Sequence, residues 1–121
     1  MLLIDAANVI GSRPNGWWRD RAGTARTFVD QVTTAARVGR LPGPVVVVLE
    51  GQARDGVAAG MLDRVTTLHA AGSGDDVVAE LSTDAVEPVT VVTADRGLRQ
   101  RVEAVGAVVV GPGWLWALLD Q

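Results

Sequence analysis

The sequence is 121 residues long, with 48% hydrophobic residues and a net charge of −3, which is typical of one globular domain spanning residues 1–121. It contains no cysteine, and all 11 of its Lys or Arg positions are arginine, which excludes disulfides, cysteine zinc sites, a Schiff-base lysine and a P-loop lysine. No apolar run is long enough to cross a membrane, and Asp5 interrupts the apolar N-terminal segment, which also lacks the basic region of a signal peptide. We therefore expect a cytoplasmic protein.

Short apolar runs alternate with amphipathic stretches along the chain. Continuous β-branched runs such as VVVVL are typical of strands buried on both faces of a sheet. Apolar residues spaced three and four positions apart are typical of helices. In chain order, we predict a strand over 2–5, a helix over 20–38, strands over 45–50 and 64–70, a helix over 75–85, a strand over 89–95, a helix over 96–105, a strand over 107–111 and an apolar C-terminal stretch over 112–119.

This alternation predicts a three-layer α/β/α fold with a mainly parallel sheet. In such sheets, ligands bind outside the carboxyl ends of the strands. Asp5 ends the first predicted strand and Asp95 ends the fourth, while Asp75 and Asp76 begin the helix after the third. Acidic positions far apart in the sequence are therefore expected to meet at one edge of the sheet.

Several carboxylates at one edge indicate a metal site. Their mutual repulsion raises pKa values, and a divalent cation removes the conflict. Mg²⁺ and Mn²⁺ prefer oxygen ligands and bridge to substrate phosphates, which indicates metal-assisted phosphodiester hydrolysis. Each acid also has a simpler alternative, because Asp75, Asp76 or Asp95 could cap a helix and Asp5 could begin a turn. We predict that Asp5, Asp75, Asp76 and Asp95 bind Mg²⁺ or Mn²⁺ and are catalytic, together with Asn8.

Three parts of the sequence resemble a known family. LLIDAANVIGSRP, GSGDDVVAEL and VVTADRGLRQRV followed by GAVVVGP are similar to the NYN domain branch of the PIN-like nuclease superfamily, in particular to YacP-like proteins. The family has an Asp with an Asn three residues later, an Asp-rich helix start and a [ST]-x-D-R segment at the end of a late strand. These patterns are matched by Asp5 with Asn8, by Asp75 with Asp76, and by Thr93, Asp95 and Arg96.

The resemblance implies a PIN-like fold with five strands in the order 3-2-1-4-5, a divalent metal, and RNA as the substrate of an endoribonuclease. It favours Asp75 over Asp76 as the direct ligand and leaves Asp76 as a further contact or a solvated side chain. Asn8 is predicted to orient Asp5 or a bound water, with a turn role as the alternative. Glu50 ends the second strand at the same edge, and we interpret it as a structural acid rather than a ligand.

Basic and aromatic residues flank the acidic positions. Arginines gather in residues 13–40 and 96–103, whereas acids dominate residues 50–95, which suits a nuclease although solvated helix faces give the same pattern. In GWWRDR, tryptophans could stack on unpaired bases beside phosphate-binding arginines, or the loop could fold tryptophan over the core. The predicted nucleic-acid-binding residues are Arg13, Trp17, Trp18, Arg19, Arg96 and Arg99.

We thus predict a metal-dependent hydrolase that cleaves RNA and does not bind membranes. The sequence is compatible with a homodimer and with binding to a partner protein. The alternatives are a catalytically silent PIN-like module that binds RNA or protein, and a toxin-type PIN ribonuclease controlled by a partner. A response-regulator receiver would need a lysine, and a haloacid-dehalogenase-type phosphatase would need D-x-D where this chain has Asp5-Ala6-Ala7. The single histidine, His69, is predicted to be packed or hydrogen-bonded rather than catalytic.

Overall fold

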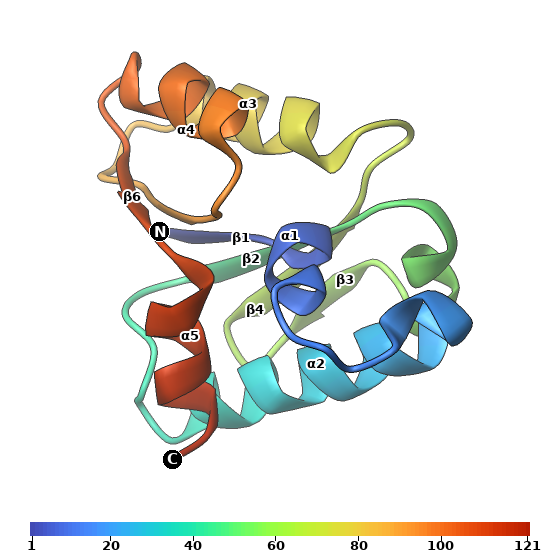
Figure 1. Cartoon of the computed structure of the whole chain (residues 1–121). Coiled ribbons are helices and arrows are strands. Elements are labelled where there is room, and N and C mark those ends of the chain that lie inside the picture. Colours follow the sequence, from blue (N-terminus) through green and yellow to red (C-terminus); the bar gives the residue numbers. More distant parts are fainter.

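A six-stranded sheet runs through the computed structural model, which describes all 121 residues (Figure 1). The strands lie in the order β3-β4-β2-β1-β5-β6, and all neighbours are parallel except β3, which is antiparallel to β4. The strands are β1 (Leu2–Asp5), β2 (Val45–Leu49), β3 (Gly60–Leu62), β4 (Val65–His69), β5 (Thr90–Val92) and β6 (Val108–Val110).

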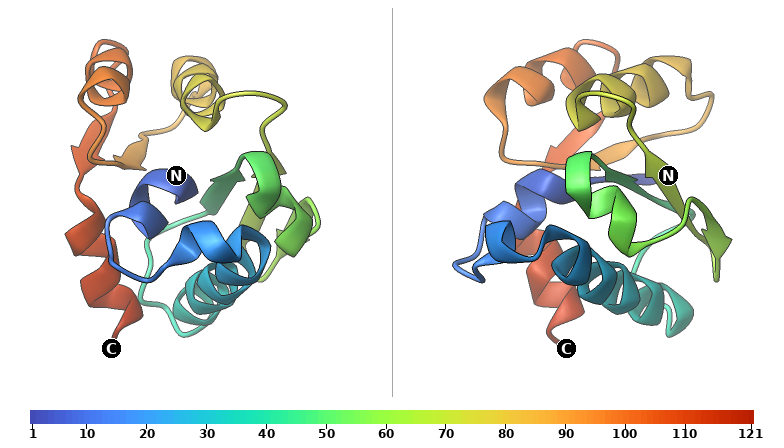
Figure 2. Two further views of the ribbon diagram at one scale, coloured as in Figure 1. Left: turned by 45° about the vertical axis from the view of Figure 1, so that its right-hand side comes forward. Right: turned by 90° about the vertical axis from the view of Figure 1, so that its right-hand side faces the viewer.

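Helices cover both faces of this sheet, as Figures 1 and 2 show. One face carries α1 (Ala6–Gly11), α2 (Arg21–Arg37) and α5 (Pro112–Leu119), and the other carries α3 (Gly74–Asp84) and α4 (Arg96–Glu103). Two short 3₁₀ helices, η1 (Trp17–Arg19) and η2 (Gly51–Gly56), precede α2 and follow β2. The predicted three-layer α/β/α arrangement is therefore confirmed.

The central strands are apolar throughout because each of their faces packs against helices. In β1, Leu2 and Ile4 belong to the core under α1, α2 and α5, whereas Leu3 belongs to the core under α3 and α4. The same alternation runs along β2, where Val45 and Val46 point into different cores. Successive strand side chains point to opposite faces, so a strand buried on both faces needs an unbroken apolar run.

The parallel part of the sheet has the predicted order. Counted along the chain, its strands β4-β2-β1-β5-β6 lie in the order 3-2-1-4-5. The prediction of five strands omits β3, whose residues are all exposed and therefore show no buried pattern. A tight reversal at Asp63 and Arg64, both with positive φ, places β3 against β4 at the edge of the sheet.

The prediction also misses α1, which begins immediately after β1 and is only 6 residues long. A helix this short shows no periodicity, and it forms because Val9 and Ile10 are fully buried against the core. All four predicted strands after the first are shorter than expected, and the strands predicted over 64–70 and 107–111 each lose one residue at either end. The strand over 89–95 ends at Val92 and the strand over 45–50 ends at Leu49, since the residues that follow begin the turns into α4 and η2.

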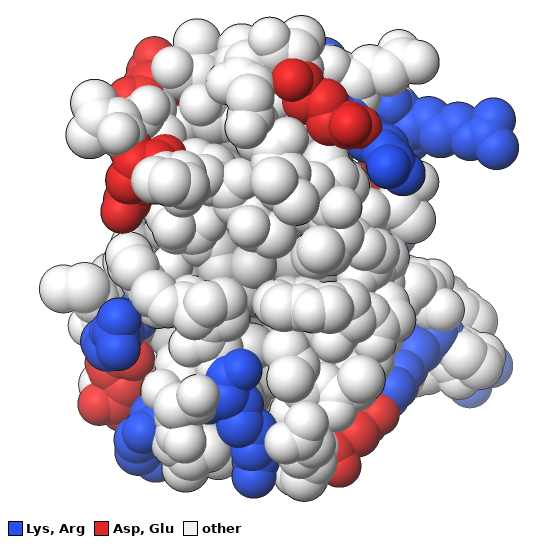
Figure 3. Space-filling view, turned by 90° about the vertical axis from the view of Figure 1, so that its left-hand side faces the viewer, with Lys and Arg blue, Asp and Glu red and all other residues white.

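Charged side chains are unevenly spread over the surface. Seen from the side of the edge strand β6, they lie towards the two ends of the molecule and leave an uncharged band between them (Figure 3). The exposed Val108 of β6 lies at this edge of the sheet. None of the helices is both long enough and apolar enough to span a membrane.

Candidate active site

A cleft of about 290 Å³ lies at the carboxyl ends of the central strands. Its acidic side chains come from four places in the chain: the end of β1, the end of β2, the first turn of α3 and the segment between β5 and α4. The structure thus brings together the predicted residues Asp5, Asn8, Asp75 and Asp95, and adds Glu50. The cleft is lined by Asp5, Ala7, Asn8, Glu50, Ser73, Asp75 and Asp95.

Asp5 is the most deeply buried of these acids, with 3% of its surface exposed. Its Oδ2 accepts a hydrogen bond from Thr93 Oγ1 at 3.2 Å. Burial raises the pKa of Asp5 to about 6, and the negative charges of Asp75 and Glu50 add to the increase. Hydrogen bonds from Thr93 and from the backbone of Asn8 oppose this shift. Asp5 is therefore held where its negative charge is costly unless a cation lies beside it.

Hydrogen bonds of Thr93 and Asn8 connect β1 and α1 to the segment that carries Asp95. The Thr93 hydroxyl, which donates to Asp5, also accepts from the backbone N–H of Asp95 at 3.1 Å. Asn8 Oδ1 accepts from the N–H of Ala94 at 2.7 Å, which fixes the orientation of the amide because only its oxygen can accept. Asn8 therefore has a positioning role in the structure, since it ties α1 to the loop before α4.

Asp95 and Asp75 lie at the N-terminal ends of two helices. Asp95 caps α4, and its Oδ1 accepts from the N–H of Leu98 at 2.8 Å. Asp75 lies in the first turn of α3, where Ser73 is the capping residue. Burial raises the pKa of Asp75, followed by the charges of Asp95 and Glu50, whereas Arg101 lowers it. Asp95 therefore caps α4, as the sequence suggested, and also lines the cleft.

Gly74 lets the start of α3 approach the end of β2. A Cβ atom at this position would lie 3.1 Å from Glu50 Oε1, which is closer than ordinary van der Waals contact. The glycine is buried and begins the helix that carries Asp75. This close approach brings the carboxylate of Glu50 to the wall of the cleft, where the sequence alone suggested only a structural role.

Asp76 lies outside the cleft. Its Oδ1 accepts from Arg101 Nη1 of α4 at 3.0 Å, and the two partly exposed side chains form an ion pair. Adjacent residues of a helix point about 100° apart, so Asp75 and Asp76 cannot both face the same cleft wall. Of the two predicted carboxylates, the structure therefore places Asp75 in the cleft and Asp76 on the surface between α3 and α4.

The predicted nucleic-acid-binding residues fall into two groups. Trp18 is 61% exposed, with the Arg19 guanidinium 5.8 Å from its ring, and Arg96 directly follows Asp95. Trp17, in contrast, packs against the core, as one interpretation of the GWWRDR loop predicted, whereas base stacking by the exposed Trp18 stays a prediction. Neither Arg19 nor Arg96 forms an ion pair within the protein.

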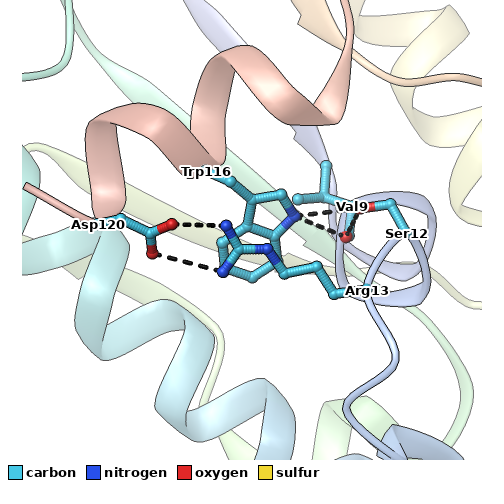
Figure 4. Close-up of polar contacts among 5 residues, drawn as sticks. All are labelled: Val9, Ser12, Arg13, Trp116 and Asp120. Atoms are coloured by element: carbon cyan, nitrogen blue, oxygen red, sulfur yellow. Dashed lines mark hydrogen bonds and ion pairs between the residues drawn. The ribbon is translucent and has the colours of Figure 1, made fainter.

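Two predicted arginines are engaged within the protein. Arg99 pairs with Glu103 one turn later in α4, at 2.7 Å. Arg13 pairs with Asp120 at 2.5 Å and lies over the ring of Trp116 (Figure 4). His69 Nε2 lies 2.7 Å from the carbonyl oxygen of Val57, which is the hydrogen-bonded role predicted for it.

The donors in the cleft suit a hard divalent cation. The chemically active groups are four carboxylates, one amide and one hydroxyl, all with oxygen atoms, and none of the residues that line the cleft is basic. As the side chains stand, no group of three or more Asp, Glu or His residues is arranged to hold a metal ion. The donor chemistry thus fits Mg²⁺ or Mn²⁺, whereas the carboxylates do not converge on one centre as they stand.

Comparison with known proteins identifies the fold. No protein-family model matches the sequence, and no curated protein matches it significantly. The crystal structure of Rae1 (YacP) from Bacillus subtilis has 17% sequence identity and a TM-score of 0.71, with 99% of this chain and 73% of that chain covered. A mutant of the same protein gives 17% identity and a TM-score of 0.69, covering 98% of this chain and 73% of that one. The chain has the fold of Rae1. The resemblance to YacP-like proteins is therefore confirmed at the level of the fold.

Proposed function

We propose that this chain is a divalent-metal-dependent nuclease that hydrolyses phosphodiester bonds, with RNA as its substrate. The observation that carries the proposal is the cleft itself, where Asp5, Glu50, Asp75 and Asp95 meet without a basic residue among its lining. Both of the shifted pKa values in the cleft, those of Asp5 and Asp75, are raised by burial and by neighbouring acids. An arrangement with this electrostatic cost is typical of a site that binds a cation.

In this proposal, Asp5, Asp75 and Asp95 hold the ion, and Glu50 provides a further carboxylate at the wall of the cleft. A bound Mg²⁺ or Mn²⁺ supplies Lewis-acid chemistry and positive charge at the phosphate to be cut. Thr93 fixes the carboxylate of Asp5 through its hydrogen bond, and Asn8 fixes the loop that carries Asp95. Arg96 follows Asp95 at the first residue of α4 and could contact a phosphate beside the cleft.

Cleavage of a labelled single-stranded RNA with and without Mn²⁺ or Mg²⁺ tests the proposal. The variant Asp95→Asn removes one carboxylate but keeps the helix cap, because Asn caps helices as well as Asp does. We expect wild-type protein to cut only with metal, and Asp95→Asn to lose cleavage while it unfolds at a similar temperature. Asp84→Asn, which changes an acid at the opposite end of α3, is the matched control and should cut normally.

An RNA-binding module with this fold but without cleavage is the second candidate. It is favoured by the finding that the acids are not arranged to hold an ion as they stand. This candidate predicts RNA binding that does not depend on metal, and no cleavage by wild-type protein at any metal concentration. The same assay therefore separates the two candidates.

A further inference from the structure

A second depression lies beside the acidic cleft. It is a groove of about 520 Å³ between the end of α1 and the outer face of α5. Ala94 lies in its wall and is followed directly by Asp95 of the cleft, and the N–H of Ala94 donates to Asn8. On the other wall, Ser12 is the C-cap residue of α1, the helix that carries Asn8. A strand of nucleic acid with one phosphate in the cleft would therefore place a neighbouring nucleotide at this groove.

The floor of the groove is a stack of flat groups, shown in Figure 4. The Arg13 guanidinium lies 4.1 Å from the centre of the Trp116 ring. Trp116 is buried below it, in a T-shaped pair with Phe28, and its Nε1 donates to Ser12 Oγ at 3.1 Å. The fixed indole thus supports one face of the guanidinium.

Asp120 holds the same guanidinium from the side. Its two carboxylate oxygens accept from the two terminal nitrogens of Arg13, at 2.5 and 3.4 Å. This hydrogen bonding lowers the pKa of Asp120, so the carboxylate stays ionised under ordinary conditions. The Arg13 side chain is nevertheless 41% exposed. Its plane is therefore fixed on one face and at its edge, while much of the side chain remains open to solvent.

We propose that this groove binds an unpaired nucleotide of the RNA substrate, with its base stacked on the open face of Arg13. Stacking of bases on guanidinium planes and aromatic rings is how proteins hold single-stranded RNA. The groove wall also offers groups for the edge of a base. The N–H of Gly113, near the start of α5, has no acceptor within the helix, and the Asp120 oxygens have lone pairs beyond those used by Arg13. The proposal rests on the nuclease function above and makes single-stranded RNA its substrate class.

Binding of a short fluorescent oligoadenylate tests this site, measured in a chelator so that no cleavage occurs. Arg13→Met removes the plane and the charge, whereas Arg13→Lys keeps the charge and removes only the plane. Ala117→Phe fills the groove from α5 and leaves Arg13 and Asp120 in place. We expect each of the three changes to weaken binding about tenfold, the effect of losing one base stack. Arg37→Met, which breaks the similarly exposed Arg37–Asp63 pair, is the matched control and should bind as wild type.

Three results would overturn the inference: no binding by wild-type protein, wild-type affinity of Arg13→Lys, or wild-type affinity of Ala117→Phe. Thermal unfolding of each variant shows that it is folded, and Ala117→Phe tests the groove even if Arg13→Met is destabilised. The proposed reaction is tested separately. Binding that depends on Arg13 in a protein that never cuts RNA would remove the reaction and keep this site. Cleavage by wild-type protein with binding that is indifferent to Arg13 would remove this site and keep the reaction.

Discussion

Of the acids in the cleft, Asp5 is the most deeply buried, and its ionised form destabilises the folded protein. Its pKa is raised to about 6 by burial and by neighbouring acids, against 3.8 for an ordinary aspartate. The folded protein therefore holds a proton on Asp5 at pH values where the unfolded chain has released it. Stability must then fall as the pH rises through this window, from about 4 to about 6. At neutral pH without metal, the ionised side chain lowers the free energy of unfolding by about 2–3 kcal/mol.

Asp5→Asn should therefore stabilise the metal-free protein at pH 7, because it removes the buried charge and keeps an oxygen that can accept from Thr93. We expect its melting temperature to exceed that of wild type by several degrees, with the difference shrinking as the pH falls towards 4. Thermal unfolding in a chelator across this pH range measures it. Asp30→Asn, at an exposed position of α2, should change little. A variant that is less stable than wild type at pH 7 would contradict the electrostatic account of the cleft.

The pair Asp75 and Asp76 gives a second prediction for single residues. Asp75→Asn should lose metal-dependent RNA cleavage, because Asp75 lines the cleft. Asp76→Asn should keep it and lose only an exposed ion pair with Arg101, which contributes about 0–1 kcal/mol to stability. Cleavage rates of the two variants, measured side by side with Mn²⁺, check this. Equal loss of activity in both would show that the carboxylate outside the cleft also acts on the substrate.

For single residues, the sequence predicts which acids lie at the same edge of the sheet better than it predicts which of their side chains face the cleft. Strand ends and helix starts are visible as patterns, so Asp5, Asp75 and Asp95 could be placed at one edge. The choice between Asp75 and Asp76 depends on the rotation of α3 about its axis, which is set by packing against α4. The approach of Glu50 depends on a glycine in another segment. The residue pattern alone shows neither of these, and Asp75 was favoured over Asp76 only by the resemblance to YacP-like proteins.

Among the elements, η2 shows how a connection shapes the cleft. It follows Glu50 directly and packs against the start of α2. A Cβ atom at Gly56 would lie 2.0 Å from the backbone oxygen of Ala22, a distance that no side chain can occupy. The carbonyl of Gly56 also accepts from Arg26 Nε at 3.3 Å. Glycine at this position therefore allows η2 to contact α2.

Gly56→Ala should separate η2 from α2 and destabilise the protein by about 1–3 kcal/mol, the usual cost of overpacking. Urea denaturation of the variant and wild type measures the change. Gly72→Ala is a suitable control, because a Cβ atom there would meet nothing within 4 Å and no positive φ is required. If Gly56→Ala proved as stable as Gly72→Ala, the contact between η2 and α2 would not be the constraint that the structure indicates.

The elements that could be predicted are those whose residues are buried in a regular pattern. The valine-rich β2 and the 17-residue α2 are both of this kind. The elements missed are short, as in α1, or exposed, as in β3, and they exist because of contacts with other parts of the chain. Both elements matter to the surface of the protein. Helix α1 carries Asn8 into the cleft, and β3 forms one edge of the sheet.

For the molecule as a whole, the raised pKa values of Asp5 and Asp75 mean that their ionised side chains oppose folding at neutral pH, and the proposed cation would offset this effect. An ion that binds only the folded state adds to its stability by mass action, by about 2.7 kcal/mol when its concentration is 100 times the dissociation constant. Mn²⁺ or Mg²⁺ should therefore raise the melting temperature of wild-type protein. Asp95→Asn should show little or no increase, since it lacks one of the proposed ligands and keeps its helix cap.

Thermal unfolding against metal concentration measures this effect, and the form of the result separates its causes. An increase shared equally by wild type and Asp95→Asn would come from screening of the net charge of −3, and potassium chloride at matched ionic strength would reproduce it. An increase in melting temperature that occurs only in proteins with an intact cleft would show that a metal ion binds in the cleft. No increase at any metal concentration, together with metal-dependent cleavage, would mean that the RNA phosphate completes the coordination. That outcome agrees with side chains that do not form an ion-holding group by themselves. The absence of both effects would leave the fold without the proposed reaction and favour the RNA-binding module.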